Sequence, residues 1–130
     1  PVPSAQDTRP CFITTPIYYV NDKPHVGHAY STLAADVLAR WRRMQGREVL
    51  FLTGTDEHGQ KVEKAARDAG MEPQAFTDQV SRHFRDLAGP MGLSVDDFIR
   101  TTEPRHKAAC TALWQELVRR GEIYLGHYEG

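Results

Sequence analysis

Hydrophobic positions along the chain group into short continuous runs and into helical repeats. Residues 11–15 (CFITT) are apolar and β-branched and are followed by Pro16, which predicts a strand. A helix is predicted from Gly27, because apolar residues recur at intervals of three and four along one face. The members of this face are Tyr30, Leu33, Val37, Trp41 and Met44. Residues 49–55 (VLFLTGT) are continuously apolar, as in a strand buried within a parallel sheet.

The second half of the chain continues the alternation. A short helix is expected to end at Gly70, and a longer one is expected over residues 72–87. Residues 95–102 (VDDFIRTT) predict a strand or extended segment, and a last helix is expected from about residue 103 to Gly121. The tail, residues 123–130, is read as a possible further strand. The tryptophans, Trp41 and Trp114, fall on predicted helical faces and are expected in the core.

This order of elements predicts an α/β fold. Strands that alternate with helices at this spacing are typical of βαβ units and of an open parallel sheet. Residues 1–10 contain three prolines and are interpreted as a flexible leader. Residues 11–130 form one unit without internal repeats.

Composition excludes several classes of protein. The formal net charge is −1, so the chain lacks the basic excess of a dedicated nucleic-acid-binding domain. No apolar run reaches the roughly 18 residues that span a bilayer, so no membrane partner is expected. The two cysteines, Cys11 and Cys110, match no metal-binding spacing and favour a reducing compartment over a disulfide scaffold.

The most informative motif is residues 24–28 (PHVGH), at the start of the first predicted helix. A helix N-terminus presents unpaired N–H groups and the positive end of a dipole, which attract phosphate. Gly27 leaves room for a nucleotide against the backbone, and His25 and His28 can donate hydrogen bonds to phosphate oxygens. In open α/β sheets, ligands bind at the carboxyl ends of the strands, where this loop lies. The GxGxxG pattern of NAD sites is absent.

Other interpretations of these residues remain open. His25 and His28 can be helix-start residues without a ligand, and Asp56 can be the N-cap of the following helix. A zinc site built from His25, His28, Asp56 and His58 has suitable ligand types, although its spacing fits no known helix-borne metal motif. Lys23 near the loop is read more readily as a solvated surface charge than as a phosphate ligand.

Residues 25–28 (HVGH) resemble the HIGH signature of the class I aminoacyl-tRNA synthetases, with Val26 in place of isoleucine. Residues 14–21 (TTPIYYVN), 54–59 (GTDEHG) and 98–102 (FIRTT), with the closing 128–130 (YEG), resemble the methionyl members in particular. The resemblance runs from about Phe12 to the end of the chain. It implies the Rossmann-like catalytic domain of the class, with this chain as its N-terminal part, ending near the start of the connective insertion.

The resemblance also implies a reaction and a set of site residues. Methionine is activated by ATP, which carries Mg²⁺, to methionyl-adenylate, and the methionyl group passes to tRNA(Met). His25 and His28 match the catalytic signature histidines. The residues that match ATP-binding positions are Pro16, Asn21, His25, Gly27 and His28. The residues that match methionine-binding positions are Ile17, Tyr19 and Asp56, with Asp56 holding the substrate ammonium group.

The family's second signature, the lysine-containing KMSKS loop, does not occur in these 130 residues. We therefore expect the chain alone to be inactive, with contacts to tRNA and any zinc of the connective insertion outside it. Two alternatives remain: a non-catalytic module that binds ATP in a half-site, and another nucleotidyltransferase with an HxGH motif. A cytoplasmic location is expected, with the mitochondrial matrix as the alternative.

Overall fold

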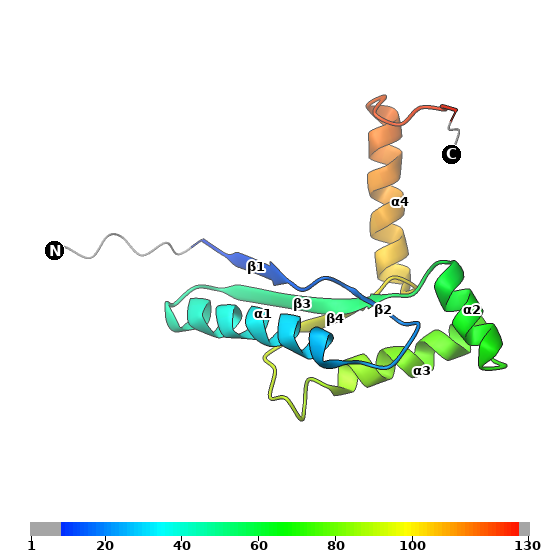
Figure 1. The fold of residues 1–130 in the computed structure, drawn as a ribbon. Coiled ribbons are helices and arrows are strands. Elements are labelled where there is room, and N and C mark those ends of the chain that lie inside the picture. Colours follow the sequence, from blue (N-terminus) through cyan, green and yellow to red (C-terminus); the bar gives the residue numbers. More distant parts are fainter. Residues whose placement is uncertain (1–8, 128–130) are drawn as a thin grey trace.

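A parallel sheet and four helices make up residues 9–127, the part of the chain that the computed structural model describes (Figure 1). The strands are β1 (Cys11–Thr14), β2 (Tyr18–Tyr19), β3 (Val49–Asp56) and β4 (Asp97–Arg100). The helices are α1 (Val26–Met44), α2 (Gln60–Asp68), α3 (Pro73–Asp86) and α4 (Pro104–Arg119). The predicted α/β fold with a parallel sheet is confirmed.

β3 is the central strand of the sheet. β1 pairs with its first half, and β2 pairs with its last two residues. β4 pairs with Leu52–Thr55, so Leu52 and Thr55 each have a neighbour in β4 and another in β1 or β2. Because a strand has two edges, β1 and β2 lie on the edge of β3 opposite β4. The short β2 was not predicted from the sequence.

The helices α1 and α3 cover the same face of the sheet. Side chains alternate between the two faces of a strand, and Phe51, Thr53 and Thr55 of β3 are buried on one of them. Phe51 packs with Ile13 and with Ala39 of α1, whereas the neighbouring Tyr18 packs with residues of α2 and α3. Figure 1 accordingly shows α1 and α3 on the same side of the strands.

Within residues 9–127, the opposite face of the sheet is only partly covered. Phe12 and Leu50 point to that face and are 62% and 51% exposed. The expectation that residues 49–55 form a buried strand therefore holds for Phe51 and for residues 53–55, but not for the exposed Leu50. A continuously apolar strand is suited to burial on both of its faces. Its sequence does not show whether other elements of the same chain cover both faces.

The predicted apolar face of α1 is not its buried face. Trp41 is 45% exposed and Met44 is 80% exposed, while the helix contacts the sheet through Thr32, Asp36 and Ala39. Asp36 anchors the helix, because its carboxylate accepts the N–H and hydroxyl of Ser94, both at 2.6 Å. The helix approaches the sheet through small and hydrogen-bonded side chains, and the core position expected for Trp41 is wrong.

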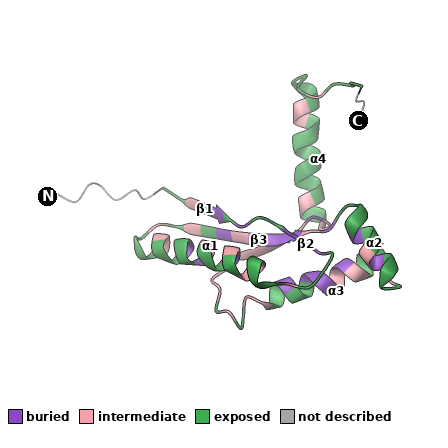
Figure 2. Cartoon of the chain, in the orientation of Figure 1, coloured by how far each residue is buried: buried purple, intermediate pink, exposed green. Residues whose placement is uncertain are grey.

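The C-terminal part differs most from expectation. α4 extends away from the sheet, no residue of it is buried, and Trp114 is 61% exposed rather than in the core (Figures 1 and 2). Residues 122–127 form no strand, and residues 128–130 lie outside the described part, as do residues 1–8 of the predicted leader. No helix within residues 9–127 is long and apolar enough to cross a membrane.

Candidate nucleotide and amino-acid site

The site begins at the N-terminus of α1, which His25 caps. His25 has an extended backbone conformation, and its Nδ1 accepts the N–H of Gly27 at 3.1 Å. In return, Nδ1 of His28 accepts the N–H of His25 at 3.1 Å, which completes a capping box. The first turn of α1 carries no acidic residue. The positive end of the helix dipole is therefore not neutralised by a carboxylate of its own turn.

The two histidine rings lie against each other. Their centroids are 3.8 Å apart with an angle of 29° between the planes. His25 is exposed and His28 is partly buried. Burial, with a smaller contribution from the nearby His25, lowers the pKa of His28 below its usual value. The neutral form of His28 therefore predominates at pH 7.

Gly27 has a structural role that the sequence did not indicate. A Cβ atom on Gly27 would lie 3.0 Å from Cε1 and 3.1 Å from Nδ1 of His25. A side chain here would crowd the ring that caps the helix. The glycine between the histidines thus leaves room for the His25 cap, in addition to any room that it leaves for a nucleotide.

A pocket of about 530 Å³ opens in front of this helix end. Small-molecule sites are typically clefts of roughly 300–1,000 Å³. Most of the predicted site residues line this pocket, namely Pro16, Ile17, Tyr19, Asn21, His25 and His28. Gly27 and Asp56 are not among its lining residues. The structure therefore brings together six of the eight predicted residues in one pocket.

Asp56 lies beside the pocket at the end of β3. It is the cross-strand neighbour of Tyr19 of β2, so the two predicted methionine ligands are adjacent in the sheet. Asp56 is partly buried, and its carboxylate makes no hydrogen bond or ion pair with any residue of the described range 9–127. The N-cap of α2 is Gly59, so the interpretation of Asp56 as the helix cap is wrong.

The turn after Asp56 is held by a buried carboxylate. Glu57, which is 4% exposed, accepts a two-pronged contact from Arg100 of β4, with Oε1–Nε at 2.7 Å and Oε2–Nη2 at 2.9 Å. The hydroxyls of Thr55 and Thr102 also donate to Glu57, and Arg100 contacts Asp78 of α3. The hydrogen bond from Arg100, followed by that from Gln74, lowers the pKa of Asp78. This network fixes the carboxyl ends of β3 and β4.

Sequence reasoning missed several lining residues of the pocket. Ser31 lies on α1 one turn after His28, and its hydroxyl donates to the carbonyls of Gly27 and His28. Helical spacing from His28 was the available signal for Ser31. Tyr18 and Asp22 were not predicted either. Lys23, which was read as a solvated charge, also lines the pocket, and the structure gives its ammonium group no partner within residues 9–127.

The zinc interpretation finds no support in the geometry. Across the described part of the chain, no three His, Cys, Asp or Glu side chains are arranged to hold a metal ion. His25, His28, Asp56 and His58 thus do not form such a group. Cys11 and Cys110 are both free thiols.

Comparison with known proteins identifies the family. The profile of the family described as tRNA synthetases class I (M) matches residues 11–130. The chain belongs to this class I tRNA synthetase family. Methionine–tRNA ligase of Rickettsia bellii is 64% identical over 119 residues, which cover 92% of this chain and 23% of the Rickettsia protein. A mitochondrial protein of Dictyostelium discoideum, named as a probable methionine–tRNA ligase, is 52% identical over 125 residues.

Solved structures of the family confirm the Rossmann-like fold. Methionyl-tRNA synthetase of Mycobacterium tuberculosis bound by methionyl-adenylate superposes with a TM-score of 0.88 at 44% identity, covering 92% of this chain and 24% of that one. A LeuRS of Agrobacterium radiobacter in a ternary complex with tRNA and LeuAMS superposes with a TM-score of 0.78 at 28% identity, covering 94% of this chain and 16% of that one. The chain spans about a quarter of the length of the methionyl relatives that it matches.

Proposed function

We propose that the protein containing this chain is a methionine–tRNA ligase, which activates methionine with ATP and transfers it to tRNA(Met). The observation that carries the proposal is one pocket that joins the capped histidine pair of α1 to the Ile17–Tyr19 loop. Beside it lies the carboxylate of Asp56, which has no partner within residues 9–127. The relatives named above support methionine over other amino acids.

ATP is assigned to the α1 side of the pocket. The N-terminus of α1 and the ring N–H groups of His25 and His28 face negative charge on the phosphates, which grows as the reaction proceeds. Pro16, Asn21 and Gly27 are proposed as further nucleotide contacts, and Lys23 adds a cation at the same pocket. Magnesium enters with ATP as part of the substrate.

Methionine is assigned to the β2–β3 side. The ammonium group of the amino acid would supply the cation that the carboxylate of Asp56 lacks, which offsets the cost of keeping this charge partly buried. Ile17 and Tyr19 offer apolar surface to the thioether side chain. In this arrangement the methionine carboxylate attacks the α-phosphate, the bond from that phosphorus to the β-phosphate oxygen breaks, and pyrophosphate leaves. The protein contributes orientation and charge stabilisation.

Contacts to tRNA are proposed to lie outside these 130 residues, because the chain carries no basic excess. Any zinc site is likewise proposed to lie elsewhere in the complete protein. Cytoplasm and mitochondrial matrix are both compatible proposals for location. For the 130-residue chain alone, we propose a half-site that binds ATP weakly and does not turn over, since the lysine-containing second signature is not part of it.

The test is exchange of labelled pyrophosphate into ATP by a complete protein that contains this chain. Exchange is expected with methionine and ATP. It is not expected when leucine replaces methionine or when GTP replaces ATP. The isolated 130-residue chain, assayed beside it, is expected to bind ATP in calorimetry without exchange. Equal exchange with leucine and methionine contradicts the methionine assignment, and robust exchange by the isolated chain contradicts the half-site proposal.

A further inference from the structure

Three rings from three parts of the chain contact the ring of His28. Tyr18 of β2 lies edge-on to His28 with centroids 4.9 Å apart, and Phe84 of α3 lies edge-on at 5.1 Å. His25 stacks on the remaining side at 3.8 Å. Tyr18 and Phe84 also stack on each other at 5.2 Å. The orientation of the His28 ring is therefore determined by contacts from β2 and α3 as well as by α1.

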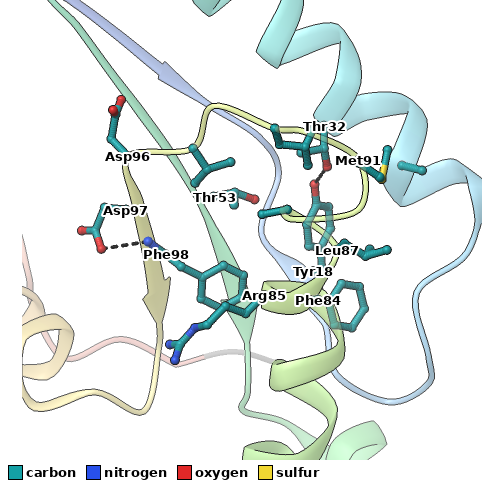
Figure 3. Close-up of a pocket in the computed structure, with 14 residues that line it drawn as sticks. Tyr18, Thr32, Thr53, Phe84, Arg85, Leu87, Met91, Asp96, Asp97 and Phe98 are labelled. Carbon is teal, nitrogen blue, oxygen red and sulfur yellow. Dashed lines mark hydrogen bonds between the residues drawn. The ribbon is translucent and has the colours of Figure 1, made fainter.

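Tyr18 and Phe84 are themselves fixed. Both are buried, at 7% and 4% exposed, and both belong to the core cluster with Val62 and Val80. The hydroxyl of Tyr18 hydrogen-bonds to the hydroxyl of Thr32, which in turn donates to the carbonyl of His28 at 2.8 Å. Figure 3 shows Tyr18 between Thr32 and Phe84, at the wall of a second cavity of about 210 Å³. Tyr18 thus separates that cavity from the pocket in front of α1.

The capping box determines which ring nitrogen carries the proton. A backbone N–H group can only donate, so Nδ1 of His28 accepts from His25, and Nδ1 of His25 accepts from Gly27. A neutral imidazole has one N–H and one acceptor nitrogen, so the proton of each ring lies on Nε2. Each ring therefore has a single N–H donor, on the atom that is not engaged by the helix end.

We propose that Tyr18 and Phe84 are positioning residues that hold the His28 ring, as its Nε2–H tautomer, toward the phosphates of the nucleotide. The proposal rests on the proposed function for the identity of the acceptor. A donor that is fixed before the reaction costs no reorganisation when charge develops on the phosphate oxygens. Neither residue needs to touch the substrate for this role, and Phe84 lies outside every motif of the sequence.

The first measurement is the tautomer itself, which needs no substrate. In the ¹⁵N-labelled 130-residue chain at pH 7.5, two-bond nitrogen–proton correlations are expected to show His28 protonated at Nε2 and unprotonated at Nδ1. Phe84→Leu is expected to shift His28 toward a mixture of both tautomers, because the imidazole then rotates more freely out of the capping hydrogen bond from the N–H of His25. Phe51→Leu is the matched control, because Phe51 is equally buried but makes no ring contact with either histidine. A proton on Nδ1 of wild-type His28 overturns the proposal.

The second measurement uses pyrophosphate exchange by a complete protein that contains this chain. Phe84→Leu is expected to lower kcat on the order of tenfold with the KM for methionine unchanged, because a displaced donor loses transition-state contacts. Phe51→Leu is expected to leave kcat within about twofold, since it does not touch the site. Equal losses in the two variants mean a merely structural role and overturn the proposal. If wild-type protein shows no exchange while the Nε2–H tautomer is present, the proposed function fails and the positioning of His28 stands.

Discussion

At the scale of single residues, the histidine pair serves both the helix and the pocket. Each Nδ1 accepts a backbone N–H of the helix end, and within residues 9–127 neither Nε2 makes a hydrogen bond. The same residues thus replace the Ser, Asp or Asn that usually caps a helix. Burial of the His28 ring lowers its pKa, because burial disfavours the charged form of the imidazole.

This lowered pKa makes stability depend on pH. The unfolded chain binds a proton on His28 at its ordinary pKa of about 6.5, whereas the folded chain binds it at lower pH. Neutral His28 makes its full contribution to the free energy of unfolding above the unfolded pKa of about 6.5. This contribution is lost as the pH falls from the unfolded pKa toward the folded pKa. Urea unfolding of the 130-residue chain from pH 7.5 to 5.0 is expected to show a steeper loss for wild type than for His28→Gln.

His28→Gln is the informative comparison, because glutamine at this position of a helix also accepts the capping N–H. It removes the titration and keeps the cap. Identical pH dependence in the two proteins would show that His28 does not titrate differently in the folded state.

The sequence predicted which residues gather at one helix end, but not how their side chains are arranged. HVGH and the strand before it placed His25, His28 and the Ile17–Tyr19 loop at one end of a helix, and the structure puts them around one pocket. The reciprocal capping, the role of Gly27 beside the His25 ring and the contact of Phe84 with His28 were not predictable. The first two features depend on side-chain orientation, and the third depends on a segment more than fifty residues away. Side-chain orientation and distant contacts leave no local pattern in the sequence.

At the scale of elements, the sheet depends on a close approach between β3 and β4. A Cβ on Gly54 would lie 2.0 Å from the carbonyl oxygen of Ile99 and 2.7 Å from its Cγ2. No side chain fits there unless the strands separate. Gly54→Ala is expected to destabilise the chain by about 1–3 kcal/mol in urea unfolding. Gly89→Ala is the control, because its Cβ would meet only a carbonyl oxygen at 4.0 Å, and an unchanged stability of Gly54→Ala would contradict the strand pairing.

The buried ion pair between Glu57, directly after β3, and Arg100 of β4 gives a second element-scale prediction. Glu57→Gln leaves the Arg100 guanidinium, which is only 17% exposed, without its main counter-charge. Breaking such a pair by changing one partner costs about 3–5 kcal/mol. Glu63→Gln, in the exposed pair with Arg67 on α2, is the matched control and is expected to cost less than about 1 kcal/mol. Chemical unfolding measures both, and equal losses would contradict the account of the network.

Helical periodicity predicted the order and approximate bounds of α1 to α4, but it misassigned the contact face of α1. Apolar spacing identifies the hydrophobic side of a helix, and the neighbour that covers this side need not lie within the chain. In α1 the contacts to the sheet are made by Thr32, Asp36 and Ala39, which carry little or no apolar signal. β2 was missed because two residues after a proline show no alternation.

At the scale of the whole molecule, large apolar side chains are exposed on several elements of the described range 9–127. They include Val37, Trp41 and Met44 on α1, Phe12 and Leu50 on the sheet, and Leu113, Trp114 and Val118 on α4. Figure 2 shows most of α4 as exposed. Exposed apolar side chains in this number favour association in water. The isolated 130-residue chain is therefore expected to self-associate at micromolar concentration, as measured by sedimentation velocity.

The variant that tests this explanation changes Val37 and Trp41 on α1, which are 61% and 45% exposed, to lysine together. It is expected to reduce self-association without changing the free energy of unfolding by more than about 0.5 kcal/mol, because surface substitutions cost little. Gln79→Lys, an exposed polar position on α3, controls for added charge. Self-association that persists in the double variant would place the contact elsewhere.

In the proposed function, two substrate subsites meet at the carboxyl ends of β2 and β3. The most direct test of this arrangement is pre-steady-state formation of methionyl-adenylate by a complete protein that contains this chain. His28→Ala is expected to lower the rate of adenylate formation about 100-fold with methionine affinity retained, because it removes the proposed hydrogen-bond donor to the phosphate oxygens. Asp56→Asn is expected to weaken methionine binding roughly 10- to 100-fold with ATP affinity retained, because it removes the charged partner of the ammonium group. Wild-type behaviour in both variants would contradict the assignment of this pocket.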